Sequence, residues 1–246
     1  MRGKGVTERI LVFGGTAEAH EVIGSLLKRD NPPLVILSLA GLHQPNRDIP
    51  AAVQQQSGGF GGTSGLVDYV RTNSIGLMID ATHPFAATMA SHAATAANQC
   101  QIPLIKLLRP PTVIAAGLLI HRVPSLIAAS HLANEWRQPI MLALGSRGSE
   151  VFLSVSSLPA SAIHQPRGLT DAMTLDQQLV ESGAKILILR DSGGDRAALW
   201  LVTARDQGCR VILIDRPPPP PVQIVDSVTE VLEWLVKNFY EYTPFT

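Results

Sequence analysis

Short aliphatic runs recur along this chain, and each is followed by a segment whose apolar residues have helical spacing. The runs are Ile10–Phe13, Leu34–Leu37, Leu77–Ile79, Ile140–Leu144, Lys185–Leu189 and Val211–Ile214. They are continuous rather than alternating, which is typical of strands buried on both faces of a parallel sheet. Strands that alternate with helices in this way predict an α/β fold of the doubly wound kind.

The strand–helix pattern restarts after Arg109-Pro110-Pro111, which predicts a domain boundary nearby. The chain has 246 residues, enough for two domains of roughly 120 residues each. We therefore expect two α/β parallel-sheet domains, over residues 1–112 and 113–246. The five-proline run at 217–221 is expected to be a stiff connector inside the second domain.

Composition excludes several functional classes. The 20 Lys and Arg residues balance 20 Asp and Glu residues, so the net charge is zero, which argues against a nucleic-acid surface. The chain has two cysteines, and its histidines are scattered, so no metal site is expected. No apolar stretch approaches the ~20 residues of a membrane span, and no signal peptide is evident, so we expect a cytoplasmic protein.

The first strand leads into the turn Gly14-Gly15-Thr16-Ala17-Glu18. Glycines at such a turn let the backbone approach a ligand, and the following helix N-terminus attracts an anion. This is the logic of dinucleotide binding, although the string is not G-x-G-x-x-G. A tight turn with Thr16 as the helix cap explains the same residues equally well, and the turn alone leaves both readings open.

A second glycine-rich segment, Ser57–Thr63, has four glycines around Phe60. Glycine is costly in an ordered segment, so this pattern indicates close approach to a ligand or to another part of the chain. A flexible surface loop is the alternative, but it does not explain the embedded Phe60.

The string Asp80-Ala81-Thr82-His83-Pro84 ends another buried strand. Ligands of open α/β sheets bind at this edge, and a carboxylate, a hydroxyl and an imidazole lie within a few residues of one another. Histidine can exchange a proton near neutral pH. The alternative is that Asp80 or Thr82 only caps the next helix, or that His83 only shapes the loop.

The second half has a matching turn, Arg190-Asp191-Ser192-Gly193-Gly194, between a strand and a helix. Arginines also follow several predicted strands, and they are Arg109, Arg147, Arg190 and Arg216. Four arginines near sheet edges suit a ligand with several carboxylates. Taken singly, most of them would be ordinary surface residues.

As an ordered set, these motifs resemble the precorrin-6A reductase family (CobK, or CbiJ in the anaerobic route). The strings that carry the resemblance are Gly14–Glu18, Ser38–Gly41, Gly58–Gly62, Asp80–Ala86, Pro103–Pro110 and Asp191–Gly194. The resemblance implies an oxidoreductase of cobalamin biosynthesis that uses NADPH to reduce one double bond of precorrin-6A, or of its cobalt form, and gives precorrin-6B. It also implies two Rossmann-like domains with the active site in the cleft between them and a tetrapyrrole substrate held there. Neighbouring corrin-pathway enzymes are candidate partners.

The motifs and the resemblance together assign candidate residues. The expected catalytic residues are Asp80 and His83. The expected cofactor residues are Gly14, Gly15, Thr16, Glu18, Ser38, Arg47, Gly59, Phe60, Gly61 and Thr82, with Arg47 facing the 2′-phosphate. The expected substrate residues are Arg109, Gly145, Arg147, Arg190, Asp191, Ser192, Gly193 and Arg216.

Two other functions fit the same elements. Another NAD(P)-dependent Rossmann reductase is weaker, because the Asp80–Pro84 string has no place in it and no Tyr-x-x-x-Lys pair occurs. A non-catalytic tetrapyrrole- or nucleotide-binding protein would keep the binding turns and lose the reaction. Oxidation of NADPH in the presence of the substrate distinguishes these possibilities.

Overall fold

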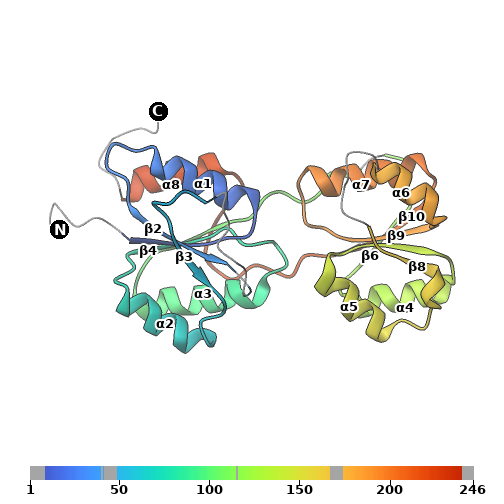
Figure 1. Ribbon diagram of the computed structural model, residues 1–246, viewed down its shortest axis with the longest axis horizontal. Helices are drawn as coiled ribbons and strands as arrows, with labels where there is room; N and C mark the ends of the chain where they lie inside the picture. The colour runs from blue at the N-terminus through green and yellow to red at the C-terminus, as the bar shows by residue number, and fades with distance from the viewer. Residues whose placement is uncertain (1–8, 40, 42–48, 115, 167–173, 240–246) are drawn as a thin grey trace. The chain divides into compact units, whose positions relative to one another are not determined.

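The computed structural model describes residues 9–39, 41, 49–114, 116–166 and 174–239 (Figure 1). The chain divides into two compact units, one formed by residues 1–109 with 217–246 and the other by residues 110–216. Each unit is built on one sheet, and the paired strands that the structure describes are parallel. The predicted α/β fold with two parallel sheets is confirmed.

The first unit contains a six-stranded sheet in the order β11-β5-β4-β1-β2-β3. Its strands are β1 (Arg9–Phe13), β2 (Leu34–Leu39), β3 (Gln54–Ser57), β4 (Leu77–Asp80), β5 (Leu104–Leu107) and β11 (Gln223–Val225). Its helices are α1 (Ala17–Leu27), α2 (Gly62–Thr72), α3 (Ala87–Cys100) and α8 (Val228–Asn238). Figure 1 shows α1 and α8 on one face of the sheet and α2 and α3 on the other.

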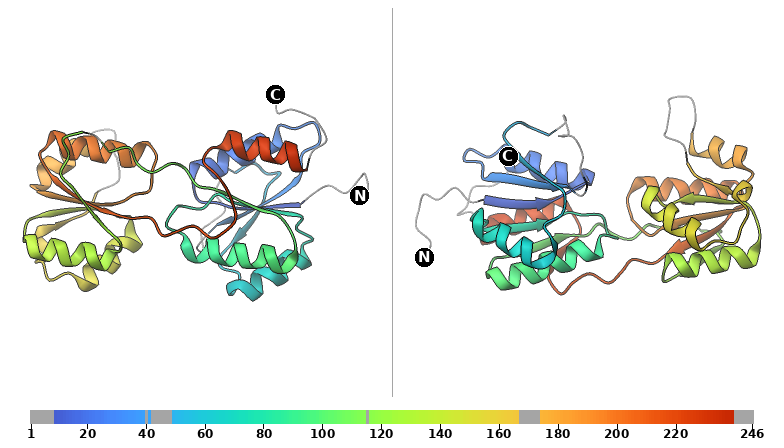
Figure 2. Two further views of the ribbon diagram at one scale, coloured as in Figure 1. Left: turned by 180° about the vertical axis from the view of Figure 1, so that it is seen from behind. Right: turned by 60° about the horizontal axis from the view of Figure 1, so that its bottom comes forward.

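The second unit contains a five-stranded sheet in the order β6-β10-β9-β7-β8. Its strands are β6 (Ile120–Val123), β7 (Ile140–Ala143), β8 (Ile163–His164), β9 (Ile186–Arg190) and β10 (Arg210–Ile214). Its helices are α4 (Leu126–Trp136), α5 (Ser146–Val155), the 3-10 turn η1 (Ala160–Ala162), α6 (Leu175–Ser182) and α7 (Asp195–Asp206). Both views of Figure 2 keep α6 and α7 on one face and α4 and α5 on the other.

The C-terminal segment departs from the predicted domain boundaries. Residues 217–246 belong to the first unit rather than to a domain spanning 113–246, and the first crossing follows Arg109. β11 pairs with β5 of the first sheet, and α8 packs against α1. The predicted boundary assumed that consecutive elements pack together, as they usually do, and here the chain returns to the first unit instead. The short segment Gln223–Val225 also lacks the aliphatic run that marks the other strands.

The central strands of both sheets are buried on both faces, as their continuous aliphatic runs predict. In the first unit, one apolar cluster lies under α1 and α8 and includes Val22, Leu37 and Leu235. A second cluster lies under α2 and α3 and includes Leu66 and Met78. Two packed faces hold the strand ends at one edge of the sheet in fixed positions, and that edge carries the candidate site.

No helix among the described residues is long and apolar enough to cross a membrane.

Candidate functional site

The order of strands in the first sheet marks one point where a ligand crevice is expected. β1 and β4 are neighbours, but the chain leaves β1 through α1 towards β2 and leaves β4 through α3 towards β5. Connections that diverge from adjacent strands open a crevice at the carboxyl edge of the sheet. The Gly14–Thr16 turn and the Asp80–His83 segment both lie at this edge, so the structure brings these predicted motifs together.

The Gly14–Thr16 turn is tied to the strands on both sides of β1. The Gly14 amide donates to the Ser38 carbonyl at the end of β2 (2.9 Å), and the Thr16 hydroxyl donates to the Ala81 carbonyl beyond β4 (2.7 Å). Thr16 also caps α1 by accepting a hydrogen bond from the Ala19 amide. The capping alternative for Thr16 is therefore correct, and it leaves the turn available to a ligand.

Gly14 and Gly15 are glycines for different reasons. A Cβ at Gly14 would lie 2.4 Å from Leu37 Cδ1, so Gly14 is required by internal packing. Gly15 has φ +101°, and a Cβ built there meets no atom within 4 Å. A positive φ favours glycine, and the open space beside Gly15 is where a phosphate could approach the backbone.

Asp80 ends β4 with both carboxylate oxygens engaged. Oδ1 accepts hydrogen bonds from the Thr82 amide (3.0 Å) and the Thr82 hydroxyl (2.6 Å). Oδ2 accepts one from Lys106 Nζ (2.8 Å), and this ion pair is buried, with side-chain exposures of 1% for Asp80 and 3% for Lys106. The geometry makes Asp80 a positioning residue for the loop that carries His83. Its predicted catalytic role stays a prediction.

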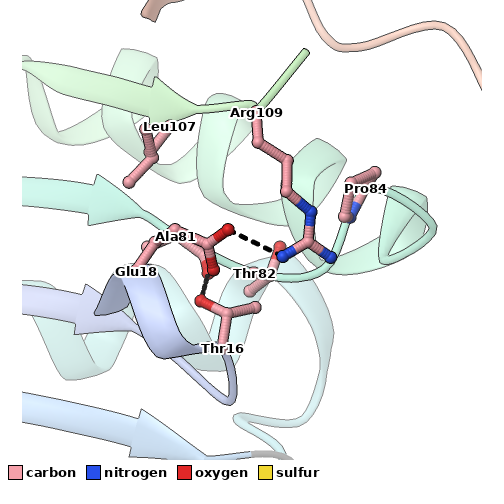
Figure 3. A pocket seen from close by; sticks show the side chains of 7 residues that line it. All are labelled: Thr16, Glu18, Ala81, Thr82, Pro84, Leu107 and Arg109. Carbon is pink, nitrogen blue, oxygen red and sulfur yellow. Dashed lines mark hydrogen bonds and ion pairs between the residues drawn. The ribbon is translucent and has the colours of Figure 1, made fainter. Parts of the chain in front are cut away.

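Glu18 and Arg109 form an ion pair at the same edge (Figure 3). Arg109 Nη1 donates to Glu18 Oε1 (2.7 Å), and the carboxylate also faces the Thr16 hydroxyl. Burial alone would raise the pKa of Glu18, but Arg109 and Thr16 outweigh it and hold that pKa below its usual value. Only about 10 Å³ of free volume remains beside the pair, so the ion pair fills most of this pocket.

Arg109 was predicted to contact the substrate, and that role stays a prediction. Its side chain lies in the first unit, beside the predicted cofactor turn (Figure 3).

His83 is partly buried and belongs to a tight turn before α3. Its Nδ1 accepts a hydrogen bond from the Phe85 amide (3.2 Å), and its carbonyl accepts one from the Ala86 amide (2.8 Å). The neutral ring therefore carries its proton on Nε2. α3 begins after this turn, at Ala87.

Phe60 packs into the first unit. Its ring meets Phe13 edge-on at 6.1 Å and Tyr69 at 5.0 Å. Its carbonyl oxygen would lie 1.6 Å from a Cβ at Gly65. The ring therefore anchors the glycine-rich loop. A Cβ at Gly58, Gly59, Gly61 or Gly62 would meet no atom within 4 Å, so these glycines make no close approach to another described part of the chain. Cofactor roles for Phe60 and the exposed Gly59 and Gly61 stay predictions, and Arg47 lies outside the described residues.

The second sheet has an equivalent crevice point between β7 and β9. These strands are neighbours, and the chain leaves β7 through α5 towards β8 but leaves β9 through α7 towards β10. Gly145 (φ +71°) precedes α5 and Gly194 (φ +77°) precedes α7. Arg190 ends β9 at this point, and burial lowers its pKa. Arg147 lies in the first turn of α5.

Asp191 holds together the two segments that cross between the units. Its Oδ1 accepts a hydrogen bond from the Thr112 amide (2.9 Å), and its Oδ2 accepts one from Arg122 Nη2 (2.7 Å). Arg216 donates from Nε to the Asp191 carbonyl (2.6 Å) and from Nη2 to the Pro110 carbonyl (2.7 Å). Asp191 and Arg216 thus anchor both segments. Their predicted contacts with the substrate stay untested.

The rest of this turn is anchored too. The buried Gly193 amide donates to Thr112 Oγ1 (3.0 Å), and the Ser192 amide donates to the Arg190 carbonyl (2.7 Å). These bonds hold the backbone of residues 190–193 against the first crossing segment. Substrate roles for Ser192 and Gly193 remain predictions.

Asp191→Asn should reduce stability in a pH-dependent way. Burial alone would raise the pKa of Asp191, but the hydrogen bonds of Arg122 and Thr112 and the charge of Arg216 hold it below its usual value. A depressed pKa contributes stability above the unfolded value of about 3.9, and this stability disappears as the pH falls through the folded pKa. We expect the variant to lose about 1–3 kcal/mol at neutral pH and to match the wild type in acid. Urea unfolding at both pH values measures this, and an equal loss at both would contradict it.

A larger cavity of about 440 Å³ lies in the second unit between β7, β8 and the C-terminal half of α6. Its lining, which includes His164, Gln178 and Glu181, contains none of the predicted site residues. Size alone therefore does not select the site, and the carboxyl-edge turns are better supported by topology. Among the described residues, no cluster of His, Cys, Asp or Glu could hold a metal ion.

Lys106, Thr112 and Arg122 were not identified from the sequence. A lysine inside the aliphatic run Leu104–Leu107 was a usable signal, because a charge in a buried strand requires a partner. Thr112 and Arg122 both bind Asp191, which lies 79 and 69 positions further along the chain. No local sequence pattern shows contacts over such separations.

Comparisons with known proteins agree with this geometry. The precorrin-6x reductase CbiJ/CobK family matches residues 9–180 and 156–236. Precorrin-6A reductase of Rhodococcus erythropolis is 32% identical over 244 residues, covering 92% of this chain and 97% of its own. Cobalt-precorrin-6A reductase of Synechocystis is 26% identical and covers 93% and 96%. The solved structure of CobK precorrin-6A reductase has a TM-score of 0.79 at 29% identity, covering 96% and 98%. The chain therefore belongs to the precorrin-6x reductase CbiJ/CobK family.

Proposed function

We propose that this protein reduces precorrin-6A, or its cobalt form, to precorrin-6B with NADPH. The observation that carries the proposal is the pair of glycine-lined turns at the crevice points of two parallel sheets, in a chain that matches precorrin-6A reductases over nearly its whole length. The first turn suits the cofactor and the second suits an acidic substrate.

The first unit fits a dinucleotide at the Gly14–Thr16 turn. The space beside Gly15 is open, and the first turn of α1 presents amides that suit a pyrophosphate. Glu18 would repel a phosphate, but its ion pair with Arg109 cancels that charge. Ser38 lies at the end of β2, where the ribose is expected, and Arg47 follows it in sequence as the candidate partner of the 2′-phosphate.

The second unit fits the carboxylates of a tetrapyrrole. Gly145 opens the N-terminus of α5, and Arg190 lies beside that helix turn. Arginine can bind a carboxylate through two parallel hydrogen bonds. Arg147 lies in the same helix turn, so it is the second candidate cation. We assign substrate binding first to the N-terminus of α5, Arg190 and Arg147. The side chains of Asp191 and Arg216 are assigned to supporting the turn.

The reaction adds one hydride and one proton across a double bond of the macrocycle. NADPH supplies the hydride when bound and leaves as NADP⁺. The chain holds the two reactants in place, which is a large contribution to such a reaction. Because His83 Nδ1 already accepts the Phe85 amide, a second ring proton would break that bond. We therefore assign the proton to solvent and the shaping of the loop to His83.

His83→Asn should lower kcat by less than about tenfold, because a true general acid contributes about 10²- to 10⁴-fold. Asparagine keeps an oxygen that can accept the Phe85 amide, so the turn should survive. Steady-state kinetics and the pH profile of kcat measure the effect. A loss of about a hundredfold in kcat with an unchanged KM would contradict this and assign the proton to His83.

The proposed function is tested by NADPH oxidation with purified precorrin-6A. We expect loss of NADPH absorbance only when protein and tetrapyrrole are both present. Tight binding of both ligands without oxidation would instead support the non-catalytic binding protein. Oxidation with a different carbonyl or nucleotide-sugar substrate, and none with the tetrapyrrole, would support another Rossmann reductase.

A further inference from the structure

The backbone conformation at position 148 does not explain why this residue is a glycine. It is the third residue of α5 (Ser146–Val155), is buried, and does not adopt a positive φ. Glycine weakens a helix relative to alanine. A glycine inside a regular helix therefore indicates close approach of another group.

Two groups approach Gly148, the guanidinium of Arg190 and the side chain of Leu144. A Cβ built on Gly148 would lie 3.1 Å from Arg190 Nη2 and 3.3 Å from Arg190 Cζ. It would also lie 2.9 Å from Leu144 Cβ, at the end of the preceding strand segment. The guanidinium thus lies directly against the first turn of α5, and a side chain at position 148 would require it to shift.

The surroundings of Arg190 make its exact placement matter. The guanidinium comes from the end of β9, and the helix turn follows β7, so the contact spans the crevice point of the second sheet. Two-point recognition of a carboxylate needs the guanidinium plane to be fixed. A flexible arginine would have to be ordered when it binds, which lowers affinity.

We infer that Gly148 is a positioning residue that seats the Arg190 guanidinium against α5 and so orients it towards a carboxylate of the substrate. This inference rests on the proposed function for the identity of the substrate. The seating of Arg190 does not depend on that identity and is tested by itself.

The competing explanation is that Gly148 only makes room for Leu144. In that case a larger residue would disturb the end of β7 and the start of α5 whatever stands at position 190. The two explanations differ in whether the cost of a side chain at 148 depends on Arg190, which a double-mutant cycle measures.

The seating is tested with Gly148→Ala and Gly148→Val, each alone and combined with Arg190→Lys. Lysine keeps the charge but lacks the planar fork, and its flexible end can move away from a new side chain. With Arg190 present, we expect Gly148→Ala to weaken tetrapyrrole binding by about tenfold and Gly148→Val by more. In the Arg190→Lys background each should weaken it by less than about twofold further.

A chemical readout is independent of substrate and activity. An arginine-specific dicarbonyl reagent, followed by peptide mass spectrometry, reports how accessible Arg190 is. We expect faster labelling of Arg190 in Gly148→Ala and Gly148→Val, with unchanged labelling of Arg9. Gly24→Ala is the matched control, because Gly24 lies inside α1 and its Cβ would meet no atom within 4 Å; it should change neither labelling nor binding.

Equal losses of binding in both backgrounds, or unchanged labelling of Arg190 in folded variants, would overturn the inference and leave Leu144 packing as the reason for Gly148. A wild-type protein that does not bind precorrin-6A would instead refute the proposed function. In that case faster labelling of Arg190 would still establish the seating.

Discussion

Replacing Lys106 with methionine is expected to lower the stability of the first unit by about 3–5 kcal/mol, because it leaves the Asp80 carboxylate buried without its cation. The ion pair is 2.8 Å long and almost completely shielded from solvent. Asp80 and Lys106 are also directly paired in the register of β4 and β5, so the bond joins two central strands. Hydrogen exchange of the β4 and β5 amides, followed by mass spectrometry, measures the loss in the unit concerned.

The double variant Asp80→Asn with Lys106→Met provides the control. It removes both charges and should recover much of the lost stability, since a neutral pair leaves no buried charge without a partner. The Thr82 amide can still bond to the asparagine oxygen. If Lys106→Met alone were as stable as the wild type, the ion pair would not be what holds these strand ends.

Gly15→Val is expected to weaken NADPH binding by about ten- to hundredfold, the equivalent of one lost hydrogen bond to a charged group. The valine side chain would enter the open space beside the turn, where the pyrophosphate is proposed to lie. The same change also strains the backbone, because φ is +101°, which costs about 1–3 kcal/mol. Titration of NADPH by protein fluorescence measures the affinity, and a thermal melt measures the strain.

Gly183→Val separates these two effects. Gly183 also has a positive φ (+64°) with no atom near its Cβ, but it ends α6 in the second unit. We expect it to lower the melting temperature and to leave NADPH affinity unchanged. Wild-type affinity in a folded Gly15→Val variant would move the cofactor away from this turn.

The sequence predicted most of the strands because the central ones are continuous aliphatic runs. β11 could not be predicted in this way, since Gln223–Val225 has only two aliphatic residues and its partner β5 is more than 110 positions away. α5 was also missed, because Ser146–Val155 contains glycine and several serines. In both cases packing against the rest of the unit decides the structure, not local pattern.

In the candidate site, too, features set by local sequence were predictable and features set by packing were not. Glycines at strand ends identified both crevice points, since backbone requirements are local. The partners of charged groups were not predictable, because Lys106 reaches Asp80 and Arg109 reaches Glu18 only through the sheet order. For this reason the sequence pointed to Asp80 but not to Lys106, which holds its carboxylate in the structure; the catalytic role of Asp80 stays a prediction.

The proposed hydride transfer from NADPH to precorrin-6A is tested most directly by a single-turnover reaction with isotopically labelled cofactor. NADPH carrying deuterium at the transferring carbon of the nicotinamide is mixed with enzyme and tetrapyrrole, and NADH is tested in parallel. We predict that the reduced tetrapyrrole gains one deuterium by mass spectrometry, and that NADPH reacts faster than NADH. A tetrapyrrole recovered unchanged from a protein that binds both ligands would contradict the account.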